Sequence, residues 1–320
     1  MDFLLSSYVL PIAFFLDILF GDPKYLPHPI RWMGKVIEAL EPHFRKIPLQ
    51  PAFNGLLFAT GLVVGTWSLT ALSLAVANGL HPILKIGLEI IFIYYCISAR
   101  SLKDAAMEVS HCLGQKNVKS ARKKVALIVG RDVDKYEENG IARAAVETVA
   151  ENLIDGVISP LFFAAIGGAP LAMAYKMVNT LDSMVGYKNE KYVNFGKASA
   201  RMDDILNFIP ARLSIPLIAI ASQILAGKGM LSFKTAVQEG SNHSSPNAGL
   251  PEAAFAGALT VKLNGPNYYN GKLVDKPYIG IRFGAARIEH IKKACDIMML
   301  SSLLWLGILW GITVAFKFQT

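Results

Sequence analysis

The sequence lacks the short motifs that mark the common nucleotide, metal and redox sites. It has no GxxxxGK[ST] phosphate loop, no HExxH zinc motif, and no GxGxxG run after a strand-like segment. Its three cysteines, Cys96, Cys112 and Cys295, lie far apart and show no CxxC spacing, which argues against a zinc site and a disulfide framework. A nucleotide, if one is used, must therefore bind at an unfamiliar kind of site.

Charged residues are also scarce. They make up 18% of the 320 residues, whereas 53% are hydrophobic, and the mean hydropathy is +0.39. The net charge of +8 comes from Lys and Arg in loops between apolar runs, without an aromatic-rich RNA-binding signature. We therefore predict a lipid bilayer and no nucleic acid as partner, and an all-α, multi-pass integral membrane protein with large polar cytoplasmic loops.

Apolar runs of membrane-spanning length recur along the chain. Clean spans are predicted at residues 3–20, 52–76, 83–98 and 297–316, the first being a retained span and not a cleaved signal. Two further apolar segments, 156–179 and 205–226, are interrupted by proline, glycine and polar residues, so we expect them to be broken or re-entrant. The prediction is a single domain over residues 1–320 with about four to six spans.

The polar loops set the expected orientation in the cell membrane. They cover residues 21–51, 99–153, 180–204 and 227–296, and they are basic, which favours the cytoplasmic side. If both interrupted segments cross completely, loop 180–204 lies outside and the chain has six spans. If both dip and return, every basic loop stays inside and there are four spans; the charge rule favours this arrangement.

Acidic residues gather where apolar runs begin. Arg143, Glu147, Glu151 and Asp155 recur every four residues, and this spacing places neighbours on one helix face. Carboxylates beside an apolar layer are costly unless they are paired or bind a cation. The alternatives are a solvated face for this stripe, and for Asp203-Asp204 a helix start favoured by the dipole.

Five segments carry a resemblance to a known family. They are DPKYLPHPIRWMG (22–34), AAVETVAENLIDGVISPLF (144–162), YKMVNTLDSMVGY (175–187), GKASARMDDILNFIPARL (196–213) and HSSPNAGLPEAAFAGAL (243–259). In these segments and their order the chain resembles the CobD/CbiB membrane proteins of cobalamin biosynthesis, the adenosylcobinamide-phosphate synthases. One departure is Asn264, where that family more often has glycine. The AmpE-type membrane family shares the layout but accounts less well for the proline-histidine and SPNAG segments.

The resemblance implies an amide ligase. Such proteins join the free propionate carboxylate of adenosylcobyric acid to aminopropanol or its O-phosphate, and we expect ATP to drive the reaction through an acyl phosphate, with Mg²⁺ required. Association with other enzymes of the late corrinoid pathway is also expected. The alternative is a non-catalytic corrinoid carrier or transporter, or an AmpE-like accessory protein.

Roles for individual residues follow from the chemistry of this reaction and not from the family match. A base must take the ammonium proton, cations must offset phosphate charge, and carboxylates suit Mg²⁺. The candidate catalytic residues are His28, His243 and Glu252. The candidate phosphate- or substrate-binding residues are Arg31, Lys188, Arg201 and Asn247. The candidate metal ligands are Glu147, Glu151, Asp155, Asp182, Asp203 and Asp204. We expect this site on the cytoplasmic side.

Overall fold

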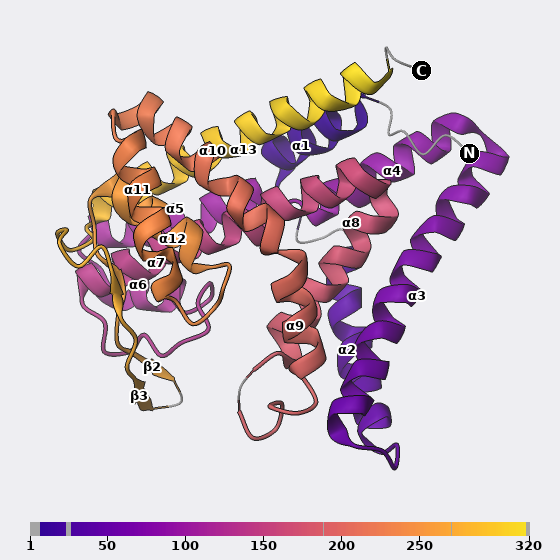
Figure 1. The fold of residues 1–320 in the computed structure, drawn as a ribbon, viewed down its shortest axis with the longest axis horizontal. Helices are drawn as coiled ribbons and strands as arrows, with labels where there is room; N and C mark the ends of the chain where they lie inside the picture. Colours follow the sequence, from indigo (N-terminus) through magenta and orange to yellow (C-terminus); the bar gives the residue numbers. More distant parts are fainter. Residues whose placement is uncertain (1–6, 24–26, 188, 270, 318–320) are drawn as a thin grey trace. The chain divides into compact units, whose positions relative to one another are not determined.

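The computed structural model describes residues 7–23, 27–187, 189–269 and 271–317 (Figure 1). Of the described residues, 75% are helical. Within this part of the chain, five helical stretches are long and apolar enough to cross a membrane: Pro51–Leu80, Pro82–Gly114, Glu138–Val185, Phe208–Ala226 and Ile288–Ala315. Val9–Phe20 is a shorter apolar helix. These findings confirm the predicted all-α, multi-pass class.

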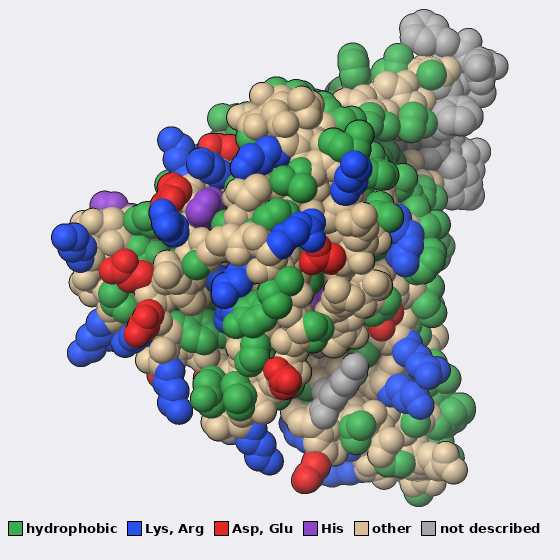
Figure 2. Space-filling model, turned by 60° about the vertical axis from the view of Figure 1, so that its left-hand side comes forward, with side chains coloured by type: hydrophobic (Ala, Val, Ile, Leu, Met, Phe, Trp, Pro, Cys, Tyr) green, Lys and Arg blue, Asp and Glu red, His purple; other side chains and the backbone are tan. Residues whose placement is uncertain are grey.

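The surface has the apolar character that a membrane protein requires. Figure 2 shows hydrophobic side chains exposed over wide areas of the visible face, with Lys and Arg side chains between them. On the long helix Pro51–Leu80, Leu69 is 69% exposed and Leu80 is 74% exposed. Because large apolar areas are rarely left in contact with water, lipid is the natural environment of these side chains.

The chain divides into two compact units. Unit 1 comprises residues 1–98, 155–207 and 306–320, and unit 2 comprises residues 99–154 and 208–305.

Unit 1 is a bundle of helices. Its elements are α1 (Val9–Phe20), α2 (Pro29–Arg45), α3 (Pro51–Leu80), α4 (Pro82–Cys96), most of the π-helix η1 (Ile154–Ile158), α8 (Ser159–Val185), α9 (Lys197–Leu206) and the end of α13 (Ile288–Lys317). Proline stands in the first turn of α2, α3 and α4, where its fixed φ angle fits and no hydrogen bond is lost. The predicted spans 52–76 and 83–98 thus correspond to α3 and α4.

The helix α8 doubles back on itself at Gly167 and Gly168. Gly168 has a φ of 65°, which favours glycine and interrupts the helix. On either side of this break, the Ser159 and Tyr175 hydroxyls donate to the same oxygen of Asn207, and the rings of Phe163 and Tyr175 stack 5.0 Å apart. A continuous helix would separate Ser159 from Tyr175 by about 24 Å. The segment 156–179 is therefore a helical hairpin, as its glycines and prolines indicated.

Unit 2 combines helices with two small antiparallel ribbons. Its helices are α5 (Ala99–Gly114), α6 (Val118–Val125), α7 (Glu138–Leu153), α10 (Phe208–Ala226), α11 (Gly229–Glu239), η2 (Gly240–Asn242), α12 (Gly249–Leu259) and the first part of α13. In the ribbons, β1 (Leu263–Asn264) pairs with β4 (Tyr278–Ile279), and β2 (Asn267–Tyr269) pairs with β3 (Lys272–Val274). Sequence reasoning missed these strands, since the turn-rich segment was interpreted as a loop.

Some local expectations differ from the structure. The dipeptide Asn139-Gly140, which is typical of turns, lies inside the first turn of α7, because the helix begins at Glu138. The break expected in segment 205–226 lies at Asn207, between α9 and α10. From Phe208, α10 runs as one helix through Pro216 to Ala226. Much of each predicted polar loop is helical.

Candidate functional site

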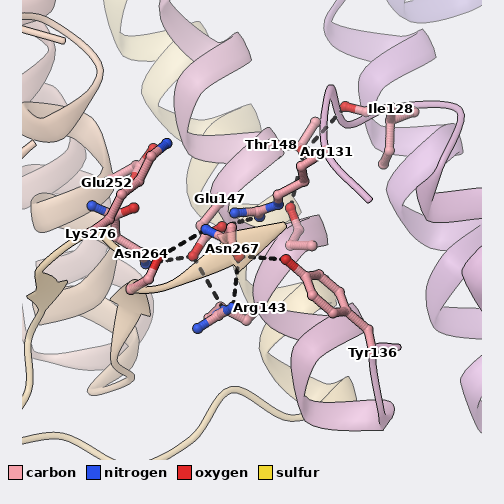
Figure 3. A network of polar contacts seen from close by, with 12 residues as sticks. Ile128, Arg131, Tyr136, Arg143, Glu147, Thr148, Glu252, Asn264, Asn267 and Lys276 are labelled. Atoms are coloured by element: carbon pink, nitrogen blue, oxygen red, sulfur yellow. Dashed lines mark hydrogen bonds and ion pairs between the residues drawn. The ribbon is translucent and has the colours of Figure 1, made fainter. Parts of the chain in front are cut away.

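The most buried polar network in unit 2 is centred on Glu147 of α7 (Figure 3). Its carboxylate accepts a hydrogen bond from Arg131, lies 3.7 Å from Nε of Arg143, and accepts the backbone N–H of Asn264 at 2.5 Å. Glu147 is only 4% exposed, so the solvated-face interpretation does not hold for it. Two guanidinium groups and one amide satisfy a charge that would otherwise be costly to bury.

The β-ribbon segment closes this network from the other side. Asn267 accepts hydrogen bonds at Oδ1 from Tyr136 and from Arg143, the latter at 3.0 Å, and its Nδ2 donates to the Gly265 carbonyl at 3.0 Å. Asn264 has a φ of 59°, in the left-handed region where glycine is favoured and asparagine is tolerated. Asparagine in place of the glycine that is more common here is therefore compatible with the turn, in which the Asn264 N–H points toward Glu147.

Arg131 is held in its charged form. Burial would lower the pKa of its guanidinium, but the carboxylate of Glu147 and the neighbouring Tyr136 outweigh that effect, and the pKa lies above the ordinary value. Since the Glu147 oxygens already accept from Arg131 and Asn264, this carboxylate is engaged inside the protein and is a poor choice for a metal ligand. Among the described residues, no group of three or more His, Cys, Asp or Glu side chains is placed to hold a metal ion.

A second buried acid, Glu252 in the first turn of α12, lies next to His243. The distance from His243 Nε2 to Glu252 Oε1 is 3.7 Å, and Glu252 is 4% exposed. The backbone N–H of Ser245 donates to His243 Nδ1 at 3.0 Å, so Nδ1 is an acceptor and the proton of the neutral ring is on Nε2, facing Glu252. The other Glu252 oxygen, Oε2, is buried and has no hydrogen-bond partner in the described part of the chain.

The electrostatics of this pair shift both groups toward their neutral forms. Burial, together with the charges of Glu147 and Glu151, raises the pKa of Glu252 well above its ordinary value, while Lys276 acts in the opposite direction. Burial and the charge of Lys276 lower the pKa of His243. A buried carboxyl with a raised pKa beside a neutral imidazole is a suitable acid–base pair.

Unit 1 contains a separate polar cluster, organised by Asn207. Its Nδ2 donates to Asp155 at 3.1 Å and to Asp203 at 3.0 Å. Its Oδ1 accepts from Ser159 at 2.6 Å and from Tyr175 at 2.9 Å. Asn207 is 2% exposed, and all four of these contacts fix the amide in one orientation. Asp155 and Asp203, both predicted metal ligands, are thereby brought together.

Lys176 and Asn179 from the returning arm of α8 complete this cluster. The Lys176 amine lies 3.4 Å from both the Asp155 carbonyl oxygen and Asn179 Oδ1, and Asn179 hydrogen-bonds Asp203. Burial raises the pKa of Asp203, although hydrogen bonds from Asn207 and Asn179 oppose the shift. One oxygen of Asp203, Oδ1, is buried and has no hydrogen-bond partner among the described residues.

The remaining predicted residues lie as follows. In unit 1, His28 is 7% exposed, contacts Asp22 at 2.7 Å through Nε2, and packs edge-on against Tyr95. Arg31 and Arg201 are exposed, and Asp182 and Asp204 are half-buried. In unit 2, Glu151 is exposed and Asn247 is buried in the loop before α12, where it lies 3.5 Å from Arg212 Nη1. Lys188 lies outside the described residues.

Sequence reasoning missed several members of both clusters. In unit 2 these are Arg131, Asn267 and Lys276; in unit 1 they are Tyr175, Lys176, Asn179 and Asn207. A usable signal existed for two of them, because Lys176 and Asn207 are polar residues inside otherwise apolar runs, and such residues need a reason.

Comparison with known proteins bears on both clusters. The family model described as CobD/Cbib protein matches residues 10–298. The chain belongs to this family. It is 47% identical to the cobalamin biosynthesis protein CobD of Clostridium perfringens, over 92% of this chain and 93% of that protein. It is 44% identical to the cobalamin biosynthesis protein CbiB of Salmonella typhimurium, over 93% of this chain and 94% of that protein.

A further relative is the CobD protein of Klebsiella pneumoniae, which is 42% identical over 94% of this chain and 95% of that protein. No solved structure matches the chain. Membership of the CobD/Cbib family supports a role in cobalamin biosynthesis. Because the match spans almost the whole chain, both clusters fall within it.

Proposed function

We propose that this protein is a membrane-bound acid–amine ligase of cobalamin biosynthesis, joining the free propionate carboxylate of adenosylcobyric acid to aminopropanol or its O-phosphate. The observation that carries this proposal is the buried Glu252–His243 pair beside Arg131 and Lys276, in a chain of this family. A carrier has less need of a buried carboxyl whose pKa is raised well above its ordinary value.

The reaction requires activation of the carboxylate, because forming an amide from a carboxylate and an ammonium group in water is unfavourable. In the proposed route, a carboxylate oxygen takes the γ-phosphoryl group of ATP, which gives an acyl phosphate and ADP. The amine then attacks the acyl carbon, the C–N bond forms, and inorganic phosphate leaves. The nitrogen must lose a proton for this attack.

Glu252 is the proposed acceptor of that proton. Its raised pKa makes the carboxylate a stronger base, and the Nε2 atom of His243 lies 3.7 Å from Oε1, beyond hydrogen-bond distance but close enough to sense its charge. The geometry favours this pair over His28, whose Nε2 contacts Asp22 at 2.7 Å. Arg131 and Lys276 supply positive charge near Glu252, which suits a site that handles anionic substrates.

Phosphate groups need additional cations at accessible positions. Arg31 and Arg201 are exposed in unit 1, and we propose that they bind the phosphate of the amine substrate or of ATP. We also propose that Asn247 makes a polar contact to substrate; it lies two residues before Gly249, where α12 begins.

The residues of unit 1 fit a requirement for Mg²⁺. Asp155, Asp203 and Asn179 offer the oxygen ligands that hard cations prefer, and Asp203 Oδ1 is a buried oxygen without a partner in the described chain. When bound there, Mg²⁺ would offset the negative charge of phosphate oxygens. Lys176 already compensates part of the charge of the two carboxylates.

We propose a cell-membrane location with the site on the cytoplasmic side, where ATP is present. The hairpin in α8 supports a common side for Asp155 and Asp203, because both contact Asn207; the basic loops favour the cytoplasm as that side. Cysteine at Asn189, in a background without native cysteines, should resist an impermeant thiol reagent in intact cells. Labelling without lysis would contradict the cytoplasmic assignment.

The direct test uses purified protein in detergent with adenosylcobyric acid, aminopropanol phosphate and Mg-ATP. Mass spectrometry should detect the amide product together with ADP. A Glu252→Gln variant that folds normally should form little product. Tight binding of the corrinoid with no product and no ADP, from protein of verified fold, would favour the carrier alternative.

A further inference from the structure

Two carboxylates that are 48 positions apart in the sequence, Asp155 and Asp203, are held by the same side-chain amide, that of Asn207. Asp155 lies in η1, and Asp203 lies in α9, yet one amide nitrogen holds both at 3.1 and 3.0 Å. The opposite atom of the same amide is held by the hydroxyls of Ser159 and Tyr175. Because both ends of the amide are fixed, Asn207 cannot rotate to release either acid without breaking several hydrogen bonds.

The backbone around Asp155 is also unusual. Residues Ile154–Ile158 form a π-helix between two α-helices, and such insertions persist mainly at functional sites because they are less stable than the α-helix. The irregular turn lets the Gly156 carbonyl accept the N–H of Ser98 at 2.9 Å, at the end of α4. A Cβ on residue 156 would lie 2.4 Å from Ser98 Oγ, so glycine permits this close approach.

One carboxylate oxygen of this cluster has no hydrogen-bond donor among the described residues. Oδ1 of Asp203 is buried without a hydrogen-bond partner in the part of the chain that the structure describes, although it belongs to the carboxyl group that Asn207 and Asn179 contact. Leaving a buried carboxylate oxygen unsatisfied is costly. Lys176 is the nearby cation that acts on Asp203, while the adjacent Asp204 adds negative charge.

We propose that Asp155 and Asp203 bind a single divalent cation, and that Asn207 is the positioning residue that sets the spacing of these two ligands. The set offers two carboxylates and the amide oxygen of Asn179, with the remaining positions open to water or phosphate. This composition suits Mg²⁺, which usually binds proteins through one or two carboxylates and keeps several waters. Of the six acids predicted from the sequence as metal ligands, the proposal keeps two, Asp155 and Asp203.

As the magnesium site of the ligase, this assignment rests on the proposed function; as a cation site it can be tested without substrates. Detergent-purified full-length protein is titrated with Mn²⁺, a paramagnetic substitute for Mg²⁺, and free Mn²⁺ is measured by electron paramagnetic resonance. We expect a single site per chain that added Mg²⁺ displaces. Absence of binding at millimolar Mn²⁺ would overturn the proposal.

Two variants assign the site to these residues. Asp203→Asn keeps the shape and the acceptor for Asn207 but removes the charge, and it should weaken Mn²⁺ binding by about tenfold or more. Asp104→Asn is the matched control, because Asp104 forms an exposed pair with Arg100, and its affinity should equal that of the wild type. Equal binding by all three proteins would place the cation elsewhere and refute the assignment.

The role of Asn207 needs a readout that a merely structural residue would not change. Asn207→Asp keeps the acceptor for Ser159 and Tyr175 but places a third carboxylate between Asp155 and Asp203. Its melting temperature at pH 8 without metal should be below that of the wild type, and Mn²⁺ should raise it by about 2–4 °C more than it raises the wild type. A lower melting temperature that Mn²⁺ does not restore would show that Asn207 acts only in folding.

These measurements separate the two proposals. If Mn²⁺ binds as expected but no amide product forms from any substrate combination, the ligase proposal fails and the cation site stands. If product forms with normal Mg²⁺ dependence in the Asp203→Asn protein, the cation site fails and the ligase stands.

Discussion

Glu147 in unit 2 and Asp203 in unit 1 look alike in the sequence and differ in the structure. Both are acids at the edge of apolar helices; Glu147 is buried and Asp203 is half-buried. Glu147 receives a hydrogen bond from Arg131, an ion pair with Arg143 and a backbone N–H. Asp203 receives hydrogen bonds from the neutral amides of Asn207 and Asn179, has Lys176 as its nearby cation without an ion pair to it, and retains an oxygen without a partner in the described chain.

The difference separates a structural charge from a functional one. A buried carboxylate with matched cations is satisfied by the protein itself, so its removal should affect folding. A buried carboxylate without a matched cation depends on something the protein binds, or on a proton, so its removal should affect binding and activity. Each prediction below tests one part of this contrast.

The largest expected effect is on stability, from Arg131→Ala. Its loss leaves Glu147 buried with Arg143 at 3.7 Å as its remaining cation, which should cost about 3–5 kcal/mol of unfolding free energy. Thermal unfolding in detergent, followed by tryptophan fluorescence, measures this change. Lys124→Ala, which removes an exposed partner of Glu108, is the control and should melt like the wild type.

If Arg131→Ala were as stable as the wild type, Glu147 would not need its arginine and the contrast would fail. Replacing both Arg131 and Glu147 by Met should recover part of the lost stability, since no charge is then left buried.

The second effect is on turnover, from Asp203→Asn. We expect about a hundredfold or greater loss in the rate of amide formation, because the proposed Mg²⁺ is bound more weakly and no longer offsets the charge of the phosphate groups. The melting temperature should stay close to that of the wild type. Product formation is followed by mass spectrometry under saturating Mg-ATP. Near-normal turnover would remove Asp203 from the reaction and return it to the helix-start interpretation.

Much of the fold could be predicted because it depends on composition and local patterns. Long apolar runs gave the spans, and Gly167, Gly168 and Pro170 marked the hairpin in α8, since these residues cannot continue a regular helix. The ribbons β1–β4 escaped prediction because strands of two or three residues leave no periodic signal.

The candidate sites were predictable only in part. The sequence singled out Glu252, His243, Asp155 and Asp203, and these residues lie in two separate polar clusters, where their site roles stay predictions. Their partners were not, because Glu147 meets Asn264 across 117 positions and Asn207 meets Asp155 across 52, and no local pattern encodes such contacts. For this reason six acids were predicted as metal ligands from the sequence, whereas in the structure one of them, Glu147, is paired with Arg131 and Arg143.

A smaller effect is expected from the exposed arginines of unit 1, in contrast to the buried Arg131. Arg201→Ala or Arg31→Ala should raise KM for aminopropanol phosphate by about tenfold, because a charge-assisted contact to the phosphate is lost. KM for unphosphorylated aminopropanol should hardly change. Equal effects on both amines would assign these arginines to the corrinoid, to the nucleotide or to structure.

The smallest expected effect concerns Glu252, which shares unit 2 with Glu147 but has a neutral imidazole as its neighbour. Its pKa is raised above 4.5 in the folded protein, so between 4.5 and the folded value the folded state binds more protons than the unfolded state. Stability contributed by the protonated acid is therefore lost as pH rises through this window. His243 acts in the opposite direction: its lowered pKa costs stability as pH falls below 6.5.

Glu252→Gln isolates the contribution of the acid. Glutamine is neutral at every pH, so the variant should gain melting temperature relative to the wild type on going from pH 5 to pH 8. Glu108→Gln, an exposed position, should show no such change. A difference between Glu252→Gln and the wild type that does not depend on pH would mean that Glu252 is satisfied as an ion, as Glu147 is. The two acids of unit 2 would then belong to one class, and Glu252 would lose its proposed role as the base.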